Sequence, residues 1–92
     1  MARVIVTVQL MPTSPDVDLK ELARHADEHI LQYAGEKSAK QDFKPIAFGL
    51  KAVELIFTMD EAKGGTEPLE VALATVPNVE SVNVTDVRRA IG

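Results

Sequence analysis

The chain has 92 residues, of which 46% are hydrophobic and 26% are charged, a formal net charge of −4 and no cysteine. This composition is typical of one small globular domain and excludes a disulfide framework and a thiolate metal site. The negative charge disfavours non-specific binding to nucleic acid or anionic lipid, because both need a basic surface, and no run approaches the roughly 18 apolar residues that span a bilayer. We therefore expect one domain over residues 1–92, in the cytoplasm, that binds a protein and neither nucleic acid nor a membrane.

The first third of the chain predicts a strand and then an amphipathic helix. Apolar and polar side chains alternate over residues 3–11, as in a half-buried strand. Asp18 and Glu21 have capping-box spacing, which predicts a helix from Leu19 to about Tyr33, just before Gly35. The polar face of this helix, which we expect to lie in solvent, contains Lys20, Glu21, Arg24, Asp27 and Glu28.

The remainder predicts two more strands, a second helix and a last strand. A strand is expected over about residues 38–44, and a stronger one within residues 50–60. After a loop at residues 61–66, Thr66 is the expected N-cap of a helix that stops before Pro77. The last strand covers about residues 79–87. The side chains expected to face the core are Val4, Val6, Val8, Leu10, Leu19, Leu22, Ala23, Ala26, Ile30, Tyr33, Val53, Leu55, Phe57, Met59, Leu69, Ala72, Leu73, Val76, Val82 and Val84.

This order predicts an α+β, ferredoxin-like βαββαβ fold. Right-handed crossovers place both helices on one face of a four-stranded antiparallel sheet, with the second and fourth strands at its edges. An edge strand tolerates Pro45, which cannot donate to a ladder. The fold hosts many functions and does not choose among them.

The usual signatures of chemistry are missing. No phosphate-binding glycine motif is present, and the serines have no neighbouring histidine that would activate them. His25 and His29 have metal-ligand spacing, but no third ligand lies nearby in sequence, so we expect a solvated helix face. Nothing in the sequence therefore looks like an active site.

Two binding functions are compatible with the predicted fold. An RNA-recognition module would display aromatic side chains on its central strands, whereas the outward positions here are Ile5, Thr7, Gln9, Glu54, Ile56 and Thr58. That pattern argues against RNA. A regulatory domain that binds a small ligand at its loops is not excluded and stays open as an alternative.

The stretch "FKPIAFGLKAVEL" closely resembles the nucleotide-exchange domain of translation elongation factor 1-beta. The likeness continues in "DEAKGGTEPLE" and "VESVNVTDV" and so covers the whole chain, whose compact length resembles the archaeal form. The resemblance implies an exchange factor that binds the GTPase elongation factor 1-alpha, releases GDP and lets GTP reload during peptide-chain elongation. The resemblance also implies that such a factor does no bond chemistry of its own and needs no cofactor, and we expect it to be a monomer when free.

The resemblance also implies which residues meet the GTPase. The ring of Phe48 would project from its loop against the partner, with Pro45 and Gly49 shaping the loop, Ile46 beside the ring and Lys51 reaching acidic groups. From the residues alone, Phe48 equally fits a core cap over the sheet end, because most aromatics are buried. Lys51 also fits an ordinary exposed charge.

The C-terminus departs from the pattern of the eukaryotic relatives. Those proteins carry a lysine next to the last residue, which enters the magnesium site of the GTPase, whereas the matching position here is Gly92. Arg88 and Arg89 lie nearby and bring positive charge towards a phosphate or magnesium site, or serve only to keep the final turn soluble.

Overall fold

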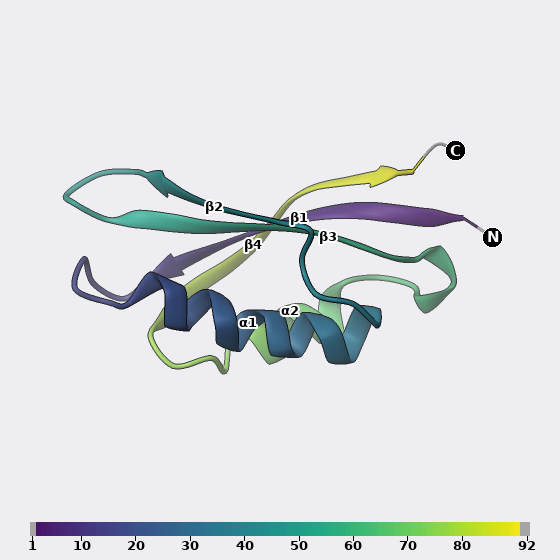
Figure 1. The fold of residues 1–92 in the computed structure, drawn as a ribbon, viewed down its shortest axis with the longest axis horizontal. Coiled ribbons are helices and arrows are strands. Elements are labelled where there is room, and N and C mark those ends of the chain that lie inside the picture. Colours follow the sequence, from purple (N-terminus) through teal and green to yellow (C-terminus); the bar gives the residue numbers. More distant parts are fainter. Residues whose placement is uncertain (1, 91–92) are drawn as a thin grey trace.

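The computed structural model describes residues 2–90, and Gly92 therefore lies outside the described residues. The elements, in chain order, are β1 (Arg3–Pro12), α1 (Leu19–Ala34), β2 (Lys40–Pro45), β3 (Lys51–Asp60), the 3-10 helix η1 (Glu61–Lys63), α2 (Glu67–Leu73) and β4 (Val79–Arg89). The strands form one antiparallel sheet in the order β2-β3-β1-β4. Both helices cover the same face of this sheet (Figure 1), which confirms the ferredoxin-like arrangement with β2 and β4 at the edges.

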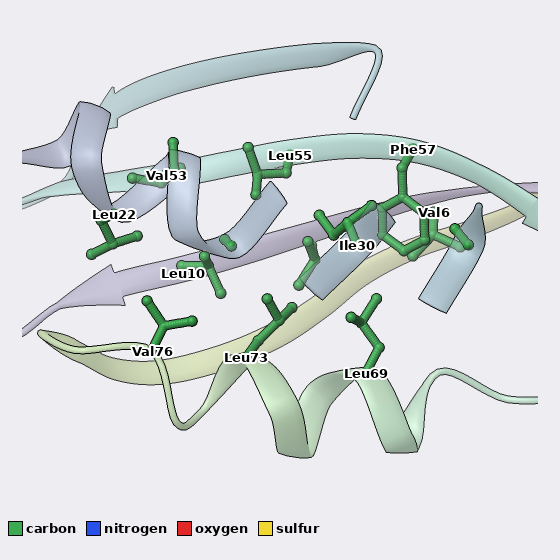
Figure 2. Close-up of a cluster of buried hydrophobic side chains, with 14 of the residues drawn as sticks. Val6, Leu10, Leu22, Ile30, Val53, Leu55, Phe57, Leu69, Leu73 and Val76 are labelled. Atoms are coloured by element: carbon green, nitrogen blue, oxygen red, sulfur yellow. The ribbon is translucent and has the colours of Figure 1, made fainter. Parts of the chain in front are cut away.

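The core lies between the two central strands and the helices. Alternate residues of β1 and β3 point towards α1 and α2, so the alternation read from the sequence is confirmed on both strands. Phe57 is the largest of the fully buried side chains, and burying such a ring contributes about 1.5–3 kcal/mol. Leu69 and Leu73 point from α2 towards the strands and belong to the same cluster of buried side chains (Figure 2).

Local signals fix both ends of α1. The Asp18 carboxylate accepts hydrogen bonds from the backbone N–H groups of Lys20 and Glu21, at 3.1 and 3.3 Å. Only this half of the capping box forms, because the Glu21 carboxylate pairs with Arg24 instead. At the other end, Gly35 takes the left-handed conformation with φ 89° and closes the helix one residue beyond the predicted end.

Asp27 corrects the expected polar face of α1. We expected Asp27 to lie in solvent, but it is buried, with only 7% of the residue exposed. Its carboxylate accepts hydrogen bonds from the Ser38 backbone N–H at 3.1 Å and from Gln41 Nε2 at 2.6 Å. The helix pattern alone cannot reveal this, because the donors come from the connection to β2 and from β2 itself. Asp27 therefore holds that connection against α1.

Smaller corrections concern the segment before α2 and the strand ends. The expected loop at 61–66 contains η1, whose N-terminus is capped by the Asp60 carboxylate through the Ala62 N–H at 2.9 Å. Thr66 is the N-cap residue of α2, but its hydroxyl donates a hydrogen bond to the Glu70 carboxylate and accepts none from a backbone N–H of the helix. The β2 strand begins at Lys40, two residues late, and β4 runs two residues longer than predicted, to Arg89.

Neither helix described in residues 2–90 is long and apolar enough to cross a membrane.

Candidate partner-binding site

The predicted site residues lie at two opposite ends of the sheet. The loop between β2 and β3 consists of residues 46–50 and is hereafter the Phe48 loop. It directly precedes β3 at one end of the sheet, whereas Arg89 pairs with Val4 at the other end. Nine residue steps from Lys51 to Asp60 separate these ends by about 30 Å, in a molecule 42 Å long. Figure 1 shows the β2–β3 hairpin at one end and both termini at the other. The structure therefore brings together Pro45, Ile46, Phe48, Gly49 and Lys51, and it places Arg88 and Arg89 far from them.

The Phe48 loop is closed by its own backbone. The Ile46 N–H donates to the Leu50 carbonyl at 2.8 Å, and the Leu50 N–H donates to the Ala47 carbonyl at 3.0 Å. Phe48 and Gly49 have φ angles of 57° and 79°, two successive residues in the left-handed region. Glycine adopts this region freely, but for a residue with a side chain it costs about 1–2 kcal/mol. The loop therefore holds an aromatic residue in an unfavourable backbone conformation.

The side chain of Phe48 is 95% exposed. The ring does not fold over the end of the sheet, so the interpretation of Phe48 as a core cap is wrong. Ile46 is 49% exposed beside it, and Phe43, on the neighbouring edge strand, is 38% exposed. Lys51 is also exposed, at the first position of β3. Apolar side chains thus gather on the β2–β3 hairpin, and Phe43 is the member that the sequence interpretation missed, although it stands in the same short stretch.

The residue that the sequence could not connect to this loop is Pro15. A Cβ atom built on Gly49 would lie 3.8 and 3.9 Å from Cβ and Cγ of Pro15, which is ordinary van der Waals contact. The loop between β1 and α1 therefore lies near the Phe48 loop, at a distance that a side chain on Gly49 would bridge. No local pattern signals the proximity of two loops that are separated by a helix and a strand.

A β-bulge determines how the two C-terminal arginines point. Thr7 pairs with Asp86 but Val8 pairs with Val84, so Thr85 is an extra residue in β4. Such a bulge shifts the side-chain alternation by one position. Beyond it, Arg88 pairs with Ile5 and lies on the open face of the sheet, whereas Arg89 pairs with Val4 on the helix-covered face.

The two arginines also differ in their partners. Arg89 donates to both carboxylate oxygens of Glu61, from Nε at 2.9 Å and from Nη2 at 2.7 Å. This bidentate hydrogen bonding lowers the pKa of Glu61 and raises that of Arg89 above its ordinary value. Arg88 donates to Asp86 on its own strand at 2.7 Å and keeps 75% of its side chain exposed. The Arg89 side chain is nearly as exposed, at 69%, but two of its donor nitrogens are held by Glu61, whereas only one of Arg88 is engaged.

The described surface offers little to a metal or a small ligand. Within residues 2–90, no group of three or more His, Asp or Glu side chains could hold a metal ion. His25 lies 3.6 Å from the Glu21 carboxylate and is 42% exposed. A hollow of about 260 Å³ beside α1 is lined by Lys20, Arg24, Asp27, Glu28, Lys37 and Gln41. It is charged where typical ligand pockets are mainly apolar, and both it and a hollow of about 270 Å³ beside Ala2, Asp60, Glu61 and Ala62 are smaller than the roughly 300–1,000 Å³ of such pockets.

Comparisons with known proteins give the family. The family model of the EF-1 guanine nucleotide exchange domain matches residues 5–90. Elongation factor 1-beta of Methanocella arvoryzae is 48% identical over 90 residues, which is 98% of this chain and 99% of that protein. The proteins of the same name from Methanothermobacter thermautotrophicus and Methanobrevibacter smithii are 43% and 44% identical, each over 97% of this chain and 98% of their own length. The chain belongs to the EF-1 guanine nucleotide exchange domain family.

Proposed function

We propose that the protein is a guanine nucleotide exchange factor of translation elongation, and that its partner is the GTPase elongation factor 1-alpha. Family membership over residues 5–90 supports the exchange activity. The observation that carries the proposed contact is the Phe48 ring, 95% exposed at the tip of a hairpin. Exposed apolar side chains that lie together mark protein–protein interaction sites, and Phe48 shares its hairpin with exposed Ile46 and Phe43.

The proposed activity needs no bond chemistry from this chain. An exchange factor works by linkage: it binds the nucleotide-free GTPase better than the nucleotide-bound form, and so weakens nucleotide binding by the same factor. A thousandfold weakening corresponds to about 4 kcal/mol of differential binding. Burial of the Phe48 ring contributes about 1.5–3 kcal/mol, and half-exposed Ile46 adds a smaller amount. In this proposal the ring is buried against the nucleotide-free GTPase and not against the nucleotide-bound form, because only a contact that differs between the two forms contributes to the required energy.

The geometry of the loop favours this use of the ring. Two hydrogen bonds close the loop, and the ring has only two rotatable side-chain torsions. Little conformational entropy is therefore lost when a partner surface takes up the ring, and preorganisation of this kind raises affinity. Pro45 and Lys51 pair at the base of the loop and, in this proposal, fix where the ring projects.

Arg88 and Arg89 form a second proposed contact region at the other end of the sheet. A GTPase that touches Phe48 and this region has to extend along the sheet for about 30 Å. Within this region, Arg88 is the candidate for direct charge contact because only its Nε is engaged, by Asp86, whereas Arg89 uses Nε and Nη2 on Glu61. Arg89 contributes to this contact region indirectly, because its hydrogen bonds to Glu61 hold the end of β4 in place.

The experiment is the release of fluorescent GDP from elongation factor 1-alpha in excess GTP and magnesium. The wild-type protein is expected to accelerate release until the rate saturates. Phe48→Ala is expected to cut the acceleration about tenfold or more, as for a buried aromatic anchor. Val71→Ala is the matched control, because Val71 is also exposed but belongs to α2. Near-normal exchange by a folded Phe48→Ala protein contradicts the proposed contact, and no acceleration by the wild type contradicts the exchange activity.

A further inference from the structure

We propose that Phe43 is a second contact residue for the GTPase: the partner that takes up the Phe48 ring also covers the Phe43 ring on the edge strand β2. The inference rests on the proposed function, because it extends the contact of the Phe48 loop onto the neighbouring strand. It assigns a binding role to a residue that the domain itself leaves partly in solvent.

Phe43 points to the helix-covered side of the sheet but lies beyond the core. It pairs with Val53, and directly paired residues of antiparallel strands project to the same face. Val53 is fully buried, whereas Phe43 is 38% exposed. Among the described residues, Phe43 belongs neither to the core cluster nor to the partly buried side chains packed against it. The core therefore does not account for this ring.

The position of α1 explains why the ring stays open. The helix is joined to β2 at Gln41, whose Nε2 donates to the Asp27 carboxylate at 2.6 Å. The charged hollow of about 260 Å³ is lined by α1 on one side and by Gln41 on the other, so the helix does not close onto the strand. Phe43 is the next residue on the same side of β2, about 7 Å further towards the Phe48 loop. A surface that approaches this edge can reach the ring.

The other residues of β2 make the exposed ring an exception. An edge strand presents unpaired backbone groups, and proteins protect such strands with charged side chains and proline. β2 follows this rule with Lys40, Lys44 and Pro45, and Lys44 also pairs with Glu54 at 3.1 Å. A partly exposed aromatic ring favours association at an edge whose other residues oppose it. Departures from a local rule of this kind are expected at functional sites.

Phe43 extends the apolar surface of the Phe48 loop. Its Cα atom lies at most about 11 Å from that of Ile46, three residues further along the chain, and Ile46 is 49% exposed. A specific interface covers about 800 Å² on each partner, so a GTPase seated on Phe48 easily spans this distance. Aromatic side chains are enriched in the buried centre of interfaces. The hairpin thus offers two rings, and the second restricts how the partner can turn about the first.

The first test measures GDP release from elongation factor 1-alpha with Phe43→Ala and Phe43→Thr. Threonine is β-branched and favours strands, so an effect shared by both variants comes from loss of the ring. About two-fifths of Phe43 is left for a partner to cover, so the concentration for half-maximal exchange should rise about threefold to sixfold. Leu31→Ala is the matched control, because Leu31 is 42% exposed on α1, and it should behave as wild type. An unchanged half-maximal concentration in Phe43 variants that circular dichroism shows to be folded overturns the inference.

Fluorine NMR separates direct contact from an indirect effect on β2. The chain has three phenylalanines, so labelling with 4-fluorophenylalanine gives three signals, of which two are assigned by their loss in Phe43→Leu and Phe48→Leu. When nucleotide-free elongation factor 1-alpha is added, the Phe43 and Phe48 signals should shift and become less sensitive to the exchange of H2O for D2O. The signal of Phe57, which is fully buried in the core, should not change.

The three signals also distinguish failure of this inference from failure of the proposed function. A shifted Phe48 signal with an unchanged Phe43 signal overturns the inference and leaves the proposed function standing. Equal shifts of all three signals overturn it too, because the whole domain would then rearrange. If no signal shifts and the wild type does not accelerate GDP release, the proposed function fails and this inference fails with it.

Discussion

Arg89 binds Glu61 through two parallel hydrogen bonds, at 2.7 and 2.9 Å, and so joins the end of β4 to the 3-10 helix that follows β3. Neighbouring backbone bonds reinforce this junction: the Ala90 N–H donates to the Arg3 carbonyl, and the Glu61 N–H donates to the Ala2 carbonyl. The end of the sheet far from Phe48 is thus fastened by the side chains and backbone of three separate segments.

This pair should be visible in the titration of Glu61. Its pKa in the folded protein lies below the ordinary value near 4.5, chiefly because Arg89 donates hydrogen bonds to the carboxylate. A depressed carboxyl pKa contributes stability that is present above the unfolded value and is lost as the pH falls through the folded one. In Arg89→Ala the Glu61 pKa should return towards 4.5, as measured by carboxyl carbon NMR. In Arg88→Ala it should stay depressed, and an equal shift in the two variants would show that the bidentate contact is not the cause.

The left-handed backbone at position 48 predicts an order of stability between two variants without the ring. Phe48→Gly removes both the ring and the backbone strain, whereas Phe48→Ala keeps a Cβ at φ 57°. Phe48→Gly should therefore be more stable by about 1 kcal/mol in urea unfolding. At the helical position Ala72 the order reverses, since glycine there costs about 1 kcal/mol relative to alanine. Alanine more stable than glycine at position 48 would show that the loop does not hold this conformation in solution.

Asp27 should be the one acidic residue of α1 whose removal matters for folding. Asp27→Ala leaves the Ser38 N–H and Gln41 Nε2 without their acceptor in a part-buried region, which costs about 2 kcal/mol. Its neighbour Glu28, exposed and paired with Arg24, is the control: Glu28→Ala should cost at most about 0.5 kcal/mol. Equilibrium unfolding in urea measures both changes. Similar values for the two would mean that Asp27 is solvated in solution.

Two glycines with open surroundings should respond differently to alanine. Nothing lies within 4 Å of a Cβ built on either Gly35 or Gly65, but only Gly35 has a positive φ, of 89°. Gly35→Ala should therefore destabilise the protein by about 1 kcal/mol through strain at the end of α1. Gly65→Ala should be neutral or stabilise it by up to about 1 kcal/mol, because alanine restricts the unfolded chain. Thermal unfolding checks both, and an equal loss at the two sites would contradict the role of the helix-end conformation.

The sequence by itself determined the strands, the two α-helices and their order, because those depend on local patterns, whereas the 3-10 helix η1 was expected to be a loop. Strand alternation put Val6 and Phe57 in the core, and the residues that begin and end α1, Asp18 and Gly35, were read from their types and spacing. The resemblance carried by "FKPIAFGLKAVEL" led to the family, which the match over residues 5–90 confirms. Partner contact by Phe48 stays a prediction, although the structure shows its ring in solvent.

Tertiary structure decided everything that depends on residues distant in sequence. Asp27 is buried because donors 11 and 14 residues away reach it. Arg89 is held by Glu61, 28 residues away, after a bulge at Thr85 that no alternation pattern reveals. The separation of the candidate site into two ends follows from the antiparallel pairing, which runs the strands back and forth along the sheet. Periodicity reports only which face a residue occupies within its own element, and the contacts between elements form when the chain packs.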